Sequence, residues 1–202
     1  MGRVGAVRGG RERRVPGVPV WGLCPYDTRT TPTDVLRDVE RTHPHLATAH
    51  GHAPNPAFVD PREFLRNRPA PARDPLEHGV PALELTDPEP ASARRAVEHL
   101  AGGLAASERA GLLVAVSEVV TNAHRYGRRP VLVRAWQGAG RVVVAVSDSG
   151  AGPSDPFVGL VAKRRRDDGG LGLWITHQMC RVVTLDFSEG FTVRLTAGDA
   201  AG

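Results

Sequence analysis

SEVVTNAHRYG (residues 117–127) places a glutamate and an asparagine four positions apart in an otherwise apolar pattern. At 100° per residue, the apolar residues around this stretch fall on one face of a helix, which predicts a buried stripe. Glu118 and Asn122 fall on the opposite side, beside the small residues Gly111 and Ala115. A carboxylate and an amide oxygen at this spacing can bind one Mg²⁺ ion and its waters, whereas an isolated pair of this kind usually lies on a solvated face.

Two glycine-containing stretches follow this helix in the sequence. VVVAVSDSGAG ends a buried strand in Asp148, and the backbone of Gly150 and Gly152 can approach a flat ligand closely. A carboxylate in that place can accept a hydrogen bond from an exocyclic amine. DDGGLGLWITHQMC puts Gly170 and Gly172 at the beginning of a helix, whose free N–H groups and positive dipole end favour an anion. Each stretch alone is equally typical of a turn followed by a helix.

The surrounding elements predict an α+β fold. Candidate strands occur in hairpins and do not alternate strictly with helices, which favours a two-layer α/β sandwich over a doubly wound sheet. We expect a mixed, mostly antiparallel sheet covered on one face by helices. The expected strands are residues 82–85, 130–137, 141–148, 182–188 and 191–197, and the expected helices are residues 87–104, 107–125 and 170–180.

Taken in this order, SEVVTNA, DSGAG and GGLGL resemble the N, G1 and G2 boxes of the GHKL (Bergerat) ATP-binding fold over residues 83–197. The resemblance implies that the chain binds ATP and Mg²⁺. It implies that Asn122 is a ligand of Mg²⁺ and that Glu118 is the catalytic residue, which orients or deprotonates the attacking group. It also implies that Asp148 binds the adenine amine.

The remaining binding residues follow from the same resemblance. Gly150 and Gly152 would flank the base. Thr192 stands in GFTVRL, where the family often reads GTTVRL, and would help to seat adenine through a water molecule. The residues that would contact the phosphates are Gly170, Leu171 and Gly172.

Among GHKL proteins, the sequence looks like the anti-sigma-factor serine/threonine kinases, which bind a sigma factor and phosphorylate an antagonist protein. No phosphoacceptor-histidine helix precedes the fold, because His99 lies inside its first helix, and this argues against a sensor histidine kinase. Tyr126 follows His124 and Arg125 where the family often has a histidine, a departure that concerns partner contacts. The alternative is a non-catalytic module that sequesters a sigma factor under nucleotide control. The sequence also leaves open the formation of a homodimer.

We expect three regions along the chain: a disordered basic tail (1–14), a remnant of a sensory domain with a Pro-rich linker (15–78), and the ATP-binding domain (79–199). Residues 22–46 resemble the C-terminal end of the MEDS sensory domain, whose N-terminal part is missing, so that the start is displaced or the module is degenerate. VPVWGLC predicts a short buried strand there, and Thr33 caps a short helix. The four histidines of THPHLATAHGH lack the rigid scaffold of a metal site.

The charge distribution argues against direct nucleic-acid binding by the folded part. The formal net charge is +4, and residues 1–14 carry all of it with five arginines and one glutamate. The alternative hypothesis is a regulator that binds nucleic acid through this tail. The sequence contains no apolar run of the roughly 20 residues that a membrane span needs. Its two cysteines lie far apart, which suggests no disulfide framework and fits a soluble cytoplasmic protein.

Overall fold

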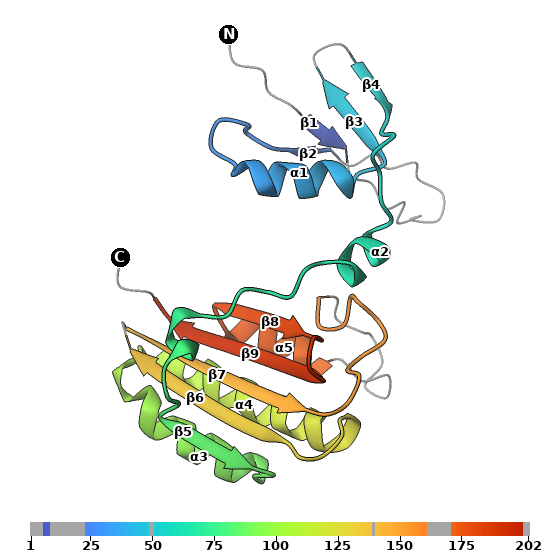
Figure 1. Cartoon of the computed structure of the whole chain (residues 1–202). Coiled ribbons are helices and arrows are strands. Elements are labelled where there is room, and N and C mark those ends of the chain that lie inside the picture. The colour runs from blue at the N-terminus through green and yellow to red at the C-terminus, as the bar shows by residue number, and fades with distance from the viewer. Residues whose placement is uncertain (1–5, 9–22, 49–50, 139, 161–170, 200–202) are drawn as a thin grey trace. The chain divides into compact units, whose positions relative to one another are not determined.

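A computed structural model describes residues 6–8, 23–48, 51–138, 140–160 and 171–199 of the chain (Figure 1). The chain divides into two compact units, Met1–Arg68 and Pro69–Gly202. The sequence suggested a boundary at Gly79. The structure groups residues 69–78 with the second unit because they pack against its sheet.

The first unit is a small antiparallel sheet with two short helices. Its strand order is β2-β1-β3-β4. The strands are β1 (Ala6–Arg8), β2 (Cys24–Pro25), β3 (His45–Thr48) and β4 (Gly51–Pro54), and the helices are α1 (Thr33–Arg41) and α2 (Pro61–Arg66). Residues 6–8 of the expected disordered tail therefore pair as a strand, while 1–5 and 9–14 lie outside the described residues. The N-cap of α1 is Pro32, and Thr33 is the first helical residue.

The described residues of the first unit bury almost no side chain. Leu23, in the expected buried strand, is 51% exposed, and residues 18–22 of that strand lie outside the described residues. The one buried side chain of the described part is Asn55, whose amide donates to the carbonyl oxygens of Glu40 at 2.6 Å and His43 at 2.9 Å. This unit is therefore held by backbone pairing and polar contacts, without an apolar core among its described residues.

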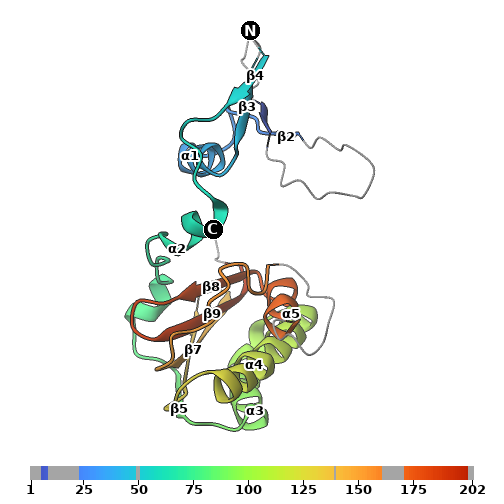
Figure 2. The ribbon, with the colours of Figure 1, turned by 90° about the vertical axis from the view of Figure 1, so that its right-hand side faces the viewer.

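The second unit is the expected α+β sandwich. Its sheet has the order β5-β6-β7-β9-β8, and each neighbouring pair is antiparallel. Figure 2 shows the three long helices together on one side of this sheet. The strands are β5 (Leu83–Thr86), β6 (Leu132–Gly138), β7 (Arg141–Asp148), β8 (Val182–Asp186) and β9 (Phe191–Gly198), and the helices are α3 (Pro90–Leu100), α4 (Ala106–Tyr126) and α5 (Leu171–Met179), with the 3₁₀ turn η2 (Ala101–Gly103) before α4.

Helix α4 packs against the sheet with the apolar stripe that the sequence predicted. Leu112, Val116 and Val120 of this stripe are fully buried. Its other side is also buried in part, because α5 packs there: a Cβ at Gly111 would lie 2.7 Å from the carbonyl oxygen of Met179. The small residues near Glu118 thus serve helix packing as well as any ligand.

Helix α3 begins later than the sequence suggested. Its N-cap is Glu89, and the expected start at Asp87 is wrong because Asp87 adopts a φ of 49° outside the helix. The Asp87 carboxylate instead accepts the N–H of Val131 at 2.9 Å. This bond ties the loop before α3 to the residue that precedes β6.

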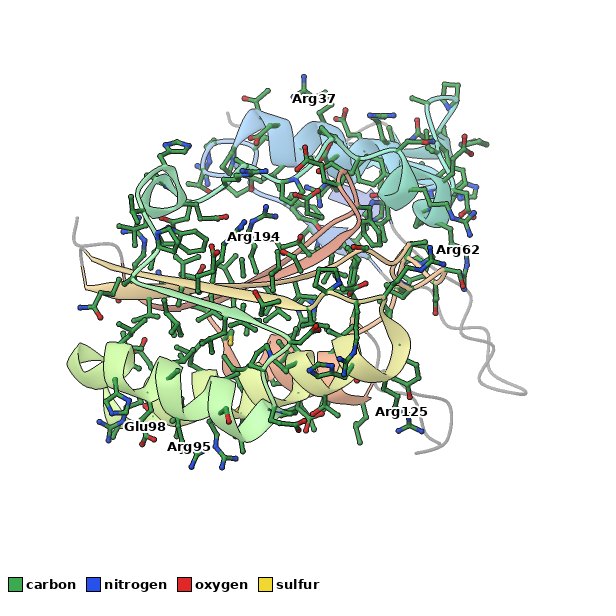
Figure 3. All side chains as sticks on the ribbon, turned by 60° about the horizontal axis from the view of Figure 1, so that its bottom comes forward. Arg37, Arg62, Arg95, Glu98, Arg125 and Arg194 are labelled. Carbon is green, nitrogen blue, oxygen red and sulfur yellow. The ribbon has the colours of Figure 1, made fainter. Side chains whose placement is uncertain are left out.

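The outer face of the sheet, opposite the helices, is partly covered by the connecting segment, which we define as residues 69–82. It contains the 3₁₀ turn η1 (Pro75–His78), which a reciprocal capping box between Asp74 and Glu77 stabilises. The indole N–H of Trp136 donates to the carbonyl oxygen of Gly79 at 3.0 Å. Figure 3 shows Arg194 on this outer face.

The structure bears on two features considered from the sequence, a membrane-spanning helix and a metal site. Within the described segments, no helix combines the length and hydropathy of a membrane span. Nor do the described segments hold a group of three or more His, Cys, Asp and Glu side chains that could bind a metal ion. His50 of the histidine-rich stretch lies outside the described residues.

Candidate functional site

A cavity of about 290 Å³ lies among α4, α5, the ends of β7 and β9, and the loop after β7. Apolar side chains form most of its wall, which suits a flat organic ligand. The polar side chains that reach it are Asn122, Tyr126, Asp148, Ser154 and Asp155. The cavity thus brings together residues of the first two sequence motifs.

Asp148 is held in a fixed orientation at the end of β7. Its side chain is buried, and Oδ1 accepts the backbone N–H of Arg128 at 3.0 Å and of Gly150 at 2.7 Å. Among the described residues, no donor reaches Oδ2. One carboxylate oxygen is therefore used by the protein, and the other is available to an amine of a ligand.

Close backbone approach around this carboxylate requires glycine. A Cβ at Gly127 would lie 2.5 Å from Cγ of Asp148, and a Cβ at Gly150 would lie 2.6 Å from its Oδ1. Gly150 therefore supports the aspartate. Gly152, with a φ of 70°, lines the cavity itself.

The beginning of α5 meets the glutamate–asparagine pair of α4. A Cβ at Gly172 would lie 2.5 Å from Oε2 of Glu118 and 3.2 Å from Nδ2 of Asn122. Leu171 is the first residue of α5, and Gly170 lies outside the described residues. Since Asn122 also lines the cavity, it connects the part of the site that holds Asp148 to this helix start.

The donor set at this junction fits a hard cation. Glu118 offers carboxylate oxygens that have no hydrogen-bond partner among the described residues, and Asn122 offers an amide oxygen. Mg²⁺ prefers oxygen ligands and commonly takes only one or two from the protein, the others coming from phosphates and water. The N-terminal end of α5 favours the negative charge of such phosphates. These residues therefore fit Mg²⁺ together with a phosphorylated ligand.

Thr192 does not reach this cavity. On β9 it lies opposite Ser147, and its hydroxyl donates to Oγ of Ser147 at 2.9 Å. Both residues line a separate cavity of about 490 Å³ on the outer face of the sheet. Side chains alternate between the faces of a strand, so the neighbouring Phe191 takes the place beside Asp148. The expected contact of Thr192 with adenine has no support in this geometry.

Two aromatic residues of the cavity, Phe191 and Tyr126, were not predicted from the sequence as site residues. A signal for Phe191 is present, because apolar residues alternate along FTVRLTA and mark the face that carries the core. Tyr126, at the end of α4, is 61% exposed and stacks under the guanidinium of Arg125 at 5.1 Å from the ring centroid. No periodic pattern distinguishes it from a surface residue.

Two titratable groups near α5 are poor candidates for chemistry. Burial raises the pKa of the Cys180 thiol to about 12, so that it stays protonated and unreactive. Burial also lowers the pKa of His177, whose Nε2 has no hydrogen-bond partner among the described residues. Neither side chain lines the cavity beside Asp148.

Comparison with known proteins identifies one family. A model of the histidine kinase-like ATPase domain matches residues 85–197. The NMR structure of the histidine kinase domain of the E. coli osmosensor EnvZ is similar to this chain at 18% sequence identity. That similarity covers 59% of this chain and 90% of that chain, with a TM-score of 0.35. A comparison with curated proteins found no match.

Proposed function

This chain belongs to the histidine kinase-like ATPase domain family, and on that basis we propose that it is a Mg-ATP-dependent protein kinase. The observation that carries the proposal is that Asn122, which lines the cavity together with Asp148, also meets Glu118 and Gly172 at the start of α5. A single elongated ligand with an amine at one end and phosphates at the other satisfies both ends. ATP has this form.

Asp148 binds the adenine amine through Oδ2. The two backbone N–H groups on Oδ1 hold the carboxylate in place before the ligand arrives, so that little ordering is needed on binding. A charge-assisted hydrogen bond of this kind contributes about 1.5–3 kcal/mol. The apolar wall of the cavity supplies the remaining contact with the base.

Asn122 and the first turn of α5 hold the phosphate end. The amide oxygen of Asn122 would be a ligand of Mg²⁺, and the N–H groups at the start of α5 would donate to the phosphate oxygens. Bound Mg²⁺ neutralises charge that develops on the transferred phosphoryl group. Gly172 lacks a side chain at the place where one would collide with Glu118, which keeps the phosphate end open.

Glu118 acts on the attacking hydroxyl of the acceptor. Its free carboxylate accepts the hydroxyl proton while the oxygen forms a bond to the γ-phosphorus. The bond between the γ-phosphorus and the bridging oxygen breaks, and its electron pair leaves with ADP. Phosphoryl transfer demands positioning more than covalent chemistry, so one base and one oriented nucleotide suffice.

The acceptor and partner follow from the sequence resemblance to anti-sigma-factor serine/threonine kinases. We propose that the chain binds a sigma factor and phosphorylates a serine or threonine of an antagonist protein. The alternative role, a module that sequesters a sigma factor under nucleotide control without transfer, requires the same cavity. The two roles differ only in what happens to the γ-phosphate.

The test combines nucleotide binding with phosphate transfer from γ-labelled ATP to proteins that copurify with the full chain. Glu118→Gln should bind ATP with the parent affinity and transfer little label. Glu98→Gln is the control, because Glu98 is exposed on α3 and points away from the sheet (Figure 3). Acid-stable label on serine or threonine supports the kinase. ATP binding without any transfer would favour the binding module, and absence of ATP binding would refute both roles.

A further inference from the structure

The base end of the cavity places an aromatic ring beside the carboxylate. Asp148, at the end of β7, and Phe191, at the start of β9, are directly opposite in the antiparallel register. Directly opposed side chains share a face of the sheet, with Cβ atoms about 4.5–5.5 Å apart. Both side chains line the cavity, so a ligand that reaches Asp148 also meets Phe191.

The Phe191 ring is fixed from two sides. A Cβ at Gly152 would lie 2.6 Å from Cδ2 of Phe191, so the loop after β7 passes directly against the ring. The ring of Phe187 packs on it with a centroid separation of 5.1 Å and an interplanar angle of 41°. Phe191 also packs against the main core of the domain. These contacts hold the ring in the cavity wall.

A hydrocarbon ring in this place cannot donate a hydrogen bond to a nitrogen of the adenine ring. The amine of adenine lies between two ring nitrogens, N1 and N7, and each of them accepts hydrogen bonds. When the amine donates to Asp148, the nitrogen on the side of Phe191 faces carbon. An ordered water molecule there would need two to four polar partners, and the Phe191 ring occupies the place of one of them without offering a hydrogen bond. Thr192, the nearest hydroxyl on the same strand, faces the other side of the sheet.

We infer that Phe191 is a specificity-determining residue of the base pocket. The site recognises a 6-aminopurine nucleotide by its exocyclic amine and does not read the ring nitrogen on the side of Phe191. This inference rests on the proposed binding of ATP. It extends the ligand class to the deaza nucleotide that keeps the amine and lacks the nitrogen on the side of Phe191, and it excludes purines without the amine.

The test compares Phe191→Thr with Phe191→Val in the full chain. Threonine and valine have nearly the same shape and both suit a strand, so the pair isolates the effect of a hydroxyl from the loss of the ring. Calorimetric titration gives the affinity of each protein for four nucleotides: ATP, 1-deaza-ATP, 7-deaza-ATP and purine riboside triphosphate, which lacks the amine.

For the parent chain, one of the two deaza nucleotides should bind within about twofold of ATP, whereas the purine riboside nucleotide should bind about ten- to a hundredfold more weakly. Phe191→Thr should discriminate against that same deaza nucleotide about two- to tenfold more strongly than Phe191→Val, because its hydroxyl can hold a water on the nitrogen. Equal discrimination by the two variants overturns the inference, as does a parent that rejects both deaza nucleotides. A parent that binds no ATP refutes the proposed function itself.

Discussion

Arg194 and Glu77, 117 positions apart in the sequence, form a buried ion pair with 2.9 Å between Nε and Oε2. Arg194 belongs to β9 and Glu77 to the connecting segment, and their side chains are 8% and 5% exposed. The same guanidinium donates to Asp186 of β8 at 2.9 Å. The connecting segment is therefore part of the second unit, and a domain that began at Gly79 would lack this pair.

Glu77→Ala should lower the free energy of unfolding by about 1–3 kcal/mol, because it leaves one side of a buried guanidinium without an acceptor. Glu84→Ala is the matched control. This variant removes the ion pair between Glu84 and Arg134, whose side chains are 52% and 45% exposed. It should lower the free energy of unfolding by only about 0–1 kcal/mol. Urea unfolding of both variants measures the difference. Similar losses in the two variants would contradict a structural role for the Glu77 pair.

Stability should fall in acid through the carboxylates that hold the outer face. The hydrogen-bonded Arg141 guanidinium lowers the pKa of Asp74 below its usual range. Burial would raise the pKa of Asp186, but hydrogen bonds from Ser188 and Arg194 outweigh it and lower the pKa. A carboxyl group with a lowered folded-state pKa stabilises the fold above its unfolded value, and this contribution disappears as the pH falls through the folded value.

This dependence can be measured by urea unfolding at a series of pH values from 7 down to about 3, a span that crosses the unfolded carboxyl pKa. The parent should lose stability below about pH 4. Asp74→Asn should be less stable than the parent at pH 7 and should lose less on acidification, because one of the titrating groups is gone. Parallel curves for the two proteins would show that Asp74 makes no such contribution.

Much of the helix–sheet layer could be predicted from the sequence, because its patterns are local. The stripe of α4 repeats at helical spacing, and β6 and β7 are short runs with valine and other apolar residues that are joined by a glycine-containing turn. The packing role of the connecting segment was not predicted, because proline-rich composition is typical of linkers. Its one local signal is DPLE (residues 74–77), an acidic N-cap followed three positions later by glutamate. The ion pairs of this stretch with Arg141 and Arg194 cannot be predicted from it, because these partners are distant in the sequence.

In the candidate site as well, local relationships could be predicted from the sequence and long-range packing could not. Glu118 and Asn122 share a helix, so their proximity follows from spacing alone. Their approach to Gly172 depends on how α5 packs on α4, which no local pattern reveals. The prediction for Thr192 transferred a motif position without its strand face, whereas the alternation of β9 assigns that residue to the outer face.

The two faces of β9 provide a direct comparison. Thr192→Val removes a hydroxyl on the outer face and should change ATP affinity by less than about twofold, since no bond to the ligand is lost. Asp148→Ala should weaken ATP binding about ten- to a hundredfold and reduce the preference for adenine over guanine. Competition binding with ATP and GTP measures both effects. A large loss of ATP affinity in Thr192→Val would show that Thr192 contacts the base. Retained preference for ATP over GTP in Asp148→Ala would show that Asp148 does not bind the adenine amine.

The last prediction concerns the metal. If Asn122 supplies an oxygen to Mg²⁺, Asn122→Ala should reduce the gain in ATP affinity that Mg²⁺ produces, while affinity in the presence of a chelator stays near that of the parent. The reduction should be at least about tenfold, since even groups that only orient metal ligands are worth ten- to a hundredfold in metal affinity. Thr121→Ala is the control, because Thr121 is the exposed neighbour on α4 and its hydroxyl donates to the carbonyl oxygen of Ser117 at 2.7 Å. Calorimetric titration with and without Mg²⁺, together with circular dichroism to verify the fold, separates loss of the ligand from loss of structure. An unchanged Mg²⁺ effect in a folded Asn122→Ala variant would exclude Asn122 as the metal ligand.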